Sequence, residues 1–207
     1  MPTQTFFNLP AAKQESVVAA AMDEFSKRNV EEAKLSNIVR LAGIPRGSIY
    51  QYFENKEDLY VYVFERLRED RREFTKPAFD YYLTSPFLTF FEHFYSLDTE
   101  YLARHPLHIQ MGKVMYSHAT GVSLSLIRAI KTRYRDLFVL AIERDQESGV
   151  IRADVDRAVM ADLCVHFMTD IFIFQNLTDR MTLKDMREHL RGTIDLIRRG
   201  VEQTTTH

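Results

Sequence analysis

Tryptophan is absent from this sequence of 207 residues, and cysteine occurs only once. The single Cys164 excludes a disulfide within the chain and favours a reducing compartment, so we expect a cytoplasmic protein. Its place on an apolar helical stripe favours a small core residue over a redox sensor. No apolar run approaches the roughly 20 residues of a membrane helix, and the N-terminus lacks a signal-peptide pattern. We therefore expect no membrane association.

Proline and glycine are also scarce, with six and seven residues, and they fall between periodic segments. This pattern predicts an all-α protein. Several catalytic motifs are missing: the glycine-rich phosphate loop, His-Glu-x-x-His, Gly-x-Ser-x-Gly and paired-cysteine zinc spacings. His105 and His108, with His118 nearby, lack an obvious carboxylate or thiol partner, so we favour rim or core histidines over metal ligands. We expect no cofactor and no metal.

Charge is distributed unevenly along the chain. Its 27 basic and 29 acidic residues give a net charge of −2, yet residues 33–53 contain no Asp or Glu. The same stretch carries Lys34, Arg40 and Arg46. A local basic segment in an acidic protein is typical of a DNA-binding surface.

This basic segment has the pattern of a helix-turn-helix. Its first apolar residues recur at helical spacing and predict one buried face: Leu35, Ile38, Val39 and Ala42. Gly43 stands where the end of a helix needs a left-handed residue. Pro45 lacks an amide hydrogen and is tolerated where the second helix opens. The segment therefore predicts two short helices joined by a tight turn.

The second helix is predicted to present polar groups to DNA. Ile49 and Phe53, four residues apart, are expected to point inward. The opposite side is expected to carry Arg46, Ser48, Tyr50 and Tyr52, and Gly47 in the first turn is expected to let a backbone approach closely. Such groups can contact phosphates and base edges in a major groove. Asn55 is expected to cap the next helix, with Lys56 beside it as a phosphate ligand. An ordinary helical hairpin with solvated basic residues is the alternative, which this coincidence of features disfavours.

Residues 10–60 resemble the DNA-binding domain of the TetR/AcrR family of bacterial transcriptional regulators. The resemblance rests on Gly-Ser-hydrophobic-Tyr at 47–50, an aromatic pair at 52–53 and Asn-Lys-Glu-x-Leu at 55–59. It implies DNA contacts from Arg46, Gly47, Ser48, Tyr50, Tyr52 and Lys56. Lys34 departs from the family, because Thr or Ser commonly caps the helix there. We add Lys34, Ser36 and Arg40 to the predicted DNA contacts.

The predicted organisation has two domains. Residues 1–54 are expected to form a three-helix DNA-binding domain, which begins with a short arm over residues 1–8. Residues 55–207 are expected to form a helical domain for effector binding and dimerisation. A long helix beginning at Asn55 would connect the two. Another long helix is expected from Gly121 to Ser148, ended by Gly149.

Aromatic and methionine residues are dense between Phe87 and Phe174. They fit a packed core or the lining of a pocket, and the family resemblance favours a pocket for an effector. The candidate pocket residues are Phe91, Phe94, Tyr95, His108, Met111, Met115, Phe138, His166 and Phe167. No cluster of Lys or Arg lies among them, so we expect a hydrophobic effector.

Two C-terminal segments carry apolar stripes that suit a helix bundle. The predicted dimer interface comprises Val165, Met168, Phe172, Leu183, Met186, Leu190, Ile194 and Ile197. The alternative is that both helices complete their own core. A two-fold symmetric dimer is also implied by the family resemblance, and it would match a palindromic operator in double-stranded DNA.

We therefore predict a homodimeric transcriptional regulator, a repressor that a hydrophobic small molecule releases from its operator. The second hypothesis is a DNA-binding dimer without an effector, controlled by a protein partner or by abundance. An enzyme on an all-helical scaffold is the third.

Overall fold

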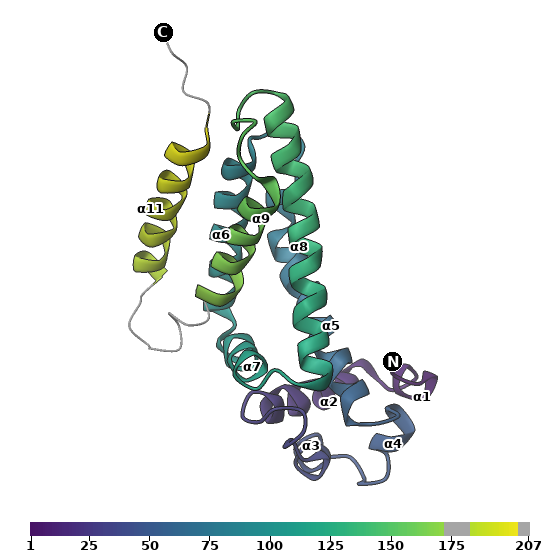
Figure 1. Ribbon diagram of the computed structural model, residues 1–207. Helices are drawn as coiled ribbons and strands as arrows, with labels where there is room; N and C mark the ends of the chain where they lie inside the picture. The colour runs from purple at the N-terminus through teal and green to yellow at the C-terminus, as the bar shows by residue number, and fades with distance from the viewer. Residues whose placement is uncertain (172–182, 203–207) are drawn as a thin grey trace. The chain divides into compact units, whose positions relative to one another are not determined.

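Helices provide the regular structure of the computed structural model, which describes residues 1–171 and 183–202 (Figure 1). The helices are α1 (Gln4–Phe7), α2 (Ala11–Phe25), α3 (Leu35–Leu41), α4 (Ile49–Tyr52), α5 (Lys56–Phe79), α6 (Phe87–Arg104), α7 (Pro106–Ser117), α8 (Gly121–Glu147), α9 (Arg157–His166), the π-helical η1 (Phe167–Ile171) and α11 (Leu183–Val201). The predicted all-α fold is confirmed. None of the described helices has both the length and the apolar content to cross a bilayer.

The chain forms two compact units. Unit 1 contains residues 1–70 and 105–127, and unit 2 contains residues 71–104 together with the chain from residue 128 onward. Helices α5 and α8 each contribute residues to both units. The functional boundary expected after residue 54 falls inside unit 1, and it stays a prediction.

Unit 1 has a core of its own, built from the apolar faces that the sequence predicts. Val18, Ala21 and Phe25 of α2 are buried together with Ile38, Val39 and Ala42 of the α3 segment, and partly buried Leu35 packs against them. The first half of α5 adds its own apolar face, which consists of Leu59, Val63 and Leu67. Because these residues recur at helical spacing, each of the three helices has one apolar face, and the three faces are buried in a common core.

The turn of the predicted helix-turn-helix is confirmed, but its second helix begins later than expected. Gly43 has φ +60°, and the Ile44 amide donates to the Val39 carbonyl at 3.1 Å, which ends α3. Helix α4 begins at Ile49 rather than at Pro45. The Ser48 amide bonds back to Pro45, three residues earlier, so residues 45–48 form a turn.

Helix α3 is held at both ends by α2. The Glu24 carboxylate, 2% exposed, accepts hydrogen bonds from the Lys34 amide and the Asn37 side chain, both at 2.9 Å. At the other end, Lys13 donates to the Gly43 carbonyl at 2.8 Å and Ser16 donates to the Ala42 carbonyl at 3.0 Å. A carboxylate at the N-terminus and an ammonium at the C-terminus both complement the helix dipole. Glu24 thus supplies the cap that the side chain at position 34 does not.

The expectation of a short arm over residues 1–8 is wrong. These residues contain α1, and Phe6 has 0% of its surface exposed. Its ring lies 4.9 Å from Phe53 and 5.4 Å from Tyr62, measured between centroids. The apolar Phe6 was a signal within the sequence, but its burial partners lie far along the chain.

Unit 2 is organised around α6, whose aromatic residues are buried. Phe87 and Phe91 lie 5.3 Å and 5.5 Å from Phe138 of α8. Buried Asp98 of α6 accepts two hydrogen bonds from Arg71 of α5, which ties these helices together. Figure 1 shows α11 running beside α6, and the two helices are in contact. Burial raises the pKa of the Cys164 thiol to about 12, as expected of a core residue rather than a redox sensor.

Glu24 generates a stability prediction. Glu24→Ala should lower the free energy of unfolding by about 1–3 kcal/mol, because the Lys34 and Asn37 donors lose a buried acceptor. Burial raises the pKa of Glu24, but the hydrogen bonds and nearby Arg28 outweigh it, so the pKa lies below 4.5. This contribution is therefore present above the ordinary pKa and is lost as the pH falls through the folded-state pKa. Chemical denaturation at pH 7 and at low pH measures both effects.

The adjacent Asp23 provides the matched control. Its carboxylate is 40% exposed and pairs with Lys27, so Asp23→Ala should change the unfolding free energy little. Glu24→Gln should flatten the acid dependence relative to the wild type. If the unfolding free energy of Glu24→Gln falls at low pH as much as that of the wild type, the role assigned to the carboxylate is contradicted.

Candidate nucleic-acid interface

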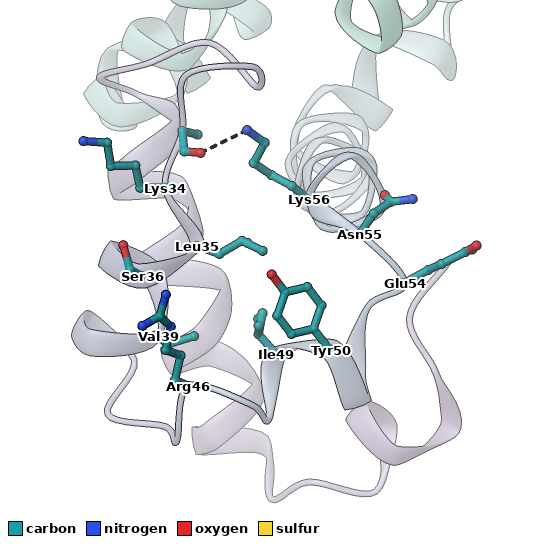
Figure 2. Close-up of a pocket in the computed structure, with 11 residues that line it drawn as sticks. Lys34, Leu35, Ser36, Val39, Arg46, Ile49, Tyr50, Glu54, Asn55 and Lys56 are labelled. Carbon is teal, nitrogen blue, oxygen red and sulfur yellow. Dashed lines mark hydrogen bonds between the residues drawn. The ribbon is translucent and has the colours of Figure 1, made fainter.

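A groove of about 450 Å³ opens on unit 1 between α3, α4 and the start of α5. Its floor is apolar, with Ala33, Val39 and Ile49 buried. Polar side chains surround this floor, and they are Lys34, Ser36, Arg46, Tyr50, Glu54, Asn55 and Lys56. Figure 2 shows Lys34 and Ser36 on one side, with Tyr50 and Lys56 across from them. The helix-turn-helix therefore presents a polar-rimmed groove rather than a flat face.

The groove carries a local excess of positive charge. Three basic side chains line it, Lys34, Arg46 and Lys56, against the single carboxylate of Glu54. This excess contrasts with the net charge of −2 of the whole chain. Cationic groups at a concave surface attract phosphate oxygens, and the attraction is strongest where several act together.

Lys56 also holds the groove together. Its ammonium donates to the carbonyls of Glu31 at 2.7 Å and Ala33 at 3.0 Å, and the bond to Ala33 is drawn in Figure 2. These bonds join the first turn of α5 to the segment that precedes α3. Asn55 caps α5 as expected, because its side-chain oxygen accepts from the Asp58 amide at 2.7 Å. Lys56 thus has a structural role that the sequence did not reveal.

Most predicted DNA contacts lie on the surface of unit 1. Exposed residues are Lys34, Ser36, Arg40, Arg46, Gly47 and Tyr50, whereas Ser48 and Lys56 are half-buried. Arg40, Gly47 and Ser48 do not line the groove itself. Tyr50 is 64% exposed and extends over the floor formed by Ile49.

Tyr52 is the exception, and the expectation that it faces outward is wrong. It is 8% exposed, and its ring lies 6.0 Å from Phe6. In a helix of a single turn, Tyr52 shares its face with Ile49, three residues earlier, so both turn toward the core. The sequence also failed to predict Glu54 at the rim and Gln51, which is exposed beside Tyr50. Their polarity within an otherwise aromatic run was the available signal.

The predicted effector residues divide between the two units. Phe91, Phe94, Tyr95, Phe138 and Phe167 are buried in unit 2, whereas Met111 and Met115 are buried and His108 half-buried in unit 1. His166 is exposed, with its Nδ1 2.7 Å from the Asp162 carbonyl oxygen, so its expected place among the aromatic residues is wrong. Among the described residues, no three His, Cys, Asp or Glu side chains are grouped to hold a metal.

The predicted dimer stripe is largely buried within the single chain. Along α11, which packs on α6, Leu190, Ile194 and Ile197 are buried, and so are Val165 and Met168. Their expected exposure to a partner is wrong, because α6 offers the same apolar surface within the chain. Phe172 lies outside the described residues, as do the side chains of Leu183 and Met186. The exposed apolar residues of this region are Val159, Leu163 and Leu196.

Comparison with known proteins is consistent with this geometry. Residues 17–63 match the model of the TetR family of bacterial regulatory proteins. The chain is 32% identical over 69 residues to the fatty acid metabolism regulator protein of Bacillus subtilis, covering 30% of this chain and 36% of that protein. The match therefore spans about a third of that relative's length.

Solved structures resemble the whole chain. A TetR family transcriptional regulator from Chloroflexus aurantiacus gives a TM-score of 0.77 at 22% identity, over 99% of this chain and 100% of that one. The transcriptional regulator FadR from Bacillus subtilis, in complex with stearoyl-CoA, gives 0.73 at 17% identity, over 91% and 99%. At these identities the likeness shows the fold.

A cationic groove built on two short helices and a glycine turn defines a helix-turn-helix DNA-binding protein. Within that class, residues 17–63 match the TetR family of bacterial regulatory proteins, and the whole chain has the fold of a solved TetR family transcriptional regulator. The relative and the two solved structures named above are regulators, so the comparisons lend no support to the hypothesis of an enzyme.

Proposed function

We propose that this protein is a homodimeric transcriptional repressor that binds a palindromic operator and is released by a hydrophobic effector. The observation that carries the DNA-binding part is the cationic groove of unit 1. Lys34 and Lys56 would contact phosphates, and Arg46, exposed at the turn before α4, would contact base edges. Tyr50, next to the groove floor, would add a phosphate contact through its hydroxyl.

Dimerisation is supported by an exposed apolar face on α9. Val159 and Leu163, four residues apart, are 64% and 53% exposed, and His166 continues the same face one turn later. Large apolar side chains gathered on one helix face are typical of an interface. Two copies related by a two-fold axis would present two α4 helices to the half-sites of a palindrome.

An effector is supported by the apolar character of unit 2 and by the family. The FadR structure contains stearoyl-CoA, whose acyl chain is hydrophobic. A ligand of that kind would bind this chain mainly by desolvation among the α6 and α8 aromatic residues. The alternative without an effector is favoured by the packing of those rings, since Phe90 and Phe94 lie 5.9 Å apart and Phe94 lies 5.6 Å from Tyr134.

The first test concerns DNA. Selection from a random duplex pool should yield a palindromic site, measured by binding at several salt concentrations. Arg46→Ala should weaken binding to that site by about 1–3 kcal/mol and relax one base position in each half-site. Lys34→Ala should weaken binding to all sequences similarly and reduce the salt slope by about one unit. A Lys34→Ala variant with altered sequence preference and an intact salt slope would contradict the phosphate contact assigned to Lys34 and indicate a base contact instead.

The second test concerns the dimer. Leu163→Glu should produce a folded monomer in analytical ultracentrifugation, because a charge would enter the α9 interface. Ile194→Glu should instead unfold unit 2, since Ile194 is 1% exposed within the chain. Leu83→Glu, at an exposed leucine before α6, is the matched control and should remain dimeric. A dimeric Leu163→Glu protein would place the interface elsewhere.

The third test concerns the effector, with stearoyl-CoA as the probe and free CoA as the polar control. Stearoyl-CoA should weaken operator binding, and operator DNA should weaken stearoyl-CoA binding by the same factor. Free CoA should do neither. If a panel of hydrophobic compounds leaves operator affinity unchanged, the hypothesis of a dimer without an effector replaces this one.

A further inference from the structure

We propose that the N-terminal segment, residues 3–7, positions α4 and thereby sets the base selectivity of the protein. This inference rests on the proposed DNA-binding function. Thr3 and Phe6 are positioning residues in this sense, because they act on DNA through α4. Neither belongs to the groove described above.

Thr3 closes the C-terminal end of α4 with two hydrogen bonds. Its amide donates to the Tyr52 carbonyl at 2.8 Å, and its hydroxyl donates to the Gln51 carbonyl at 2.6 Å. The last carbonyls of a helix have no partner within the helix, so they need donors from elsewhere. Thr3 lies nearly fifty residues away in the chain and supplies two such donors at once.

Phe6 secures the same end of α4 by packing. It is completely buried, and its ring contacts Tyr52 and Phe53 at the end of α4 and Tyr62 on α5. The N-terminal segment thus joins α4 to α5 through buried aromatic contacts. Any movement of Phe6 would be transmitted to the buried face of α4.

Helix α4 needs this support because of its length. It has four residues, and helices that short are not stable in water by themselves. The side chain of Tyr50 is exposed beside the groove and is therefore available to DNA. The orientation of α4 consequently depends on the contacts that the buried side of the helix makes. The N-terminal segment provides a large share of those contacts, because α1 and α4 pack directly on one another.

Base contacts and phosphate contacts should respond differently to a loosened α4. Hydrogen bonds to base edges are short and directional, so a small displacement abolishes them. Attraction between basic groups and phosphates acts over several ångströms and survives such a displacement. Loss of the Thr3 bonds should therefore reduce binding to the operator more than binding to unrelated DNA.

The experiment compares Thr3→Val, which removes the hydroxyl donor and keeps the shape, with Thr3→Ser, which keeps both donors. Thr5→Val is the matched control, since it makes the same chemical change at an exposed position of α1. Operator affinity of Thr3→Val should fall by about tenfold, the scale of one lost base contact, with less than about a twofold change for an unrelated duplex. Thr3→Ser and Thr5→Val should match the wild type.

A second measurement needs no DNA. Hydrogen exchange at residues 49–53 should be faster in Thr3→Val by about tenfold and unchanged in Thr5→Val, because the Thr3 hydroxyl donates to the end of α4 and Thr5 is exposed on α1. Phe6→Leu, which keeps an apolar side chain but removes the ring contacts, should show the same acceleration. Equal exchange in all variants would overturn the proposal, and so would parallel losses of affinity for the operator and for unrelated DNA.

Failure of the proposed DNA-binding function would give a different set of experimental results. A wild-type chain that selects no DNA sequence would refute DNA recognition, whereas the exchange measurement would still decide whether Thr3 and Phe6 position α4. A wild-type chain that selects an operator, together with a Thr3→Val variant of unchanged selectivity and exchange, would refute the positioning role alone.

Discussion

Helices of seven and four residues are too short to be stable in water by themselves, and the DNA-binding unit of this protein depends on two such helices. Their ends are therefore held by groups from elsewhere in the chain. Glu24 and Lys13 hold the two ends of α3, and Thr3 holds the end of α4. Each of these contacts satisfies backbone groups that a short helix leaves unpaired. The groove exists because these anchors fix its two walls.

The electrostatics of the groove follow from the same arrangement. The Glu24 carboxylate is buried beneath α3 and accepts hydrogen bonds from several donors, so its negative charge is compensated inside unit 1. Lys34 and Arg46 remain at the groove, where they give a basic surface to a chain of net negative charge. Lys56 contributes to the structure and to the charge at once, since its ammonium bonds two carbonyls at the rim.

In unit 2 the apolar residues hold the helices together by packing. Phe87 and Phe91 of α6 pack tilted and edge to face on Phe138 of α8, which stabilises this helix pair directly, and Phe90 and Phe94 stack within α6. The apolar stripe of α11 is buried in the same unit, so α9 supplies the exposed apolar face instead. A ligand entering among these rings would exchange ring contacts for ligand contacts. That exchange would give the effector a means of shifting the population of conformations.

Local patterns in the sequence determined the helical class, the turn at Gly43 and the cap at Asn55, because each depends on residues within a few positions. The family resemblance and the acid-free segment likewise predicted a DNA-binding helix-turn-helix, and residues 17–63 match the TetR family model. Local patterns did not determine the packing of a side chain that had two possible partners. An apolar stripe is equally satisfied by a second copy or by a neighbouring helix, so only the tertiary structure showed that Ile194 is buried inside the chain.

The same reason explains the inward side chain of Tyr52 and the burial of Phe6. Both depend on a contact between segments almost fifty residues apart, which no local period encodes. The carbonyl partners of Thr3 and of Lys56 are invisible in the sequence, because every residue type carries the same main-chain carbonyl. The sequence by itself determined which elements form and what chemistry they carry. The tertiary structure decided which faces meet, because burial is a property of the assembled elements and not of any one of them.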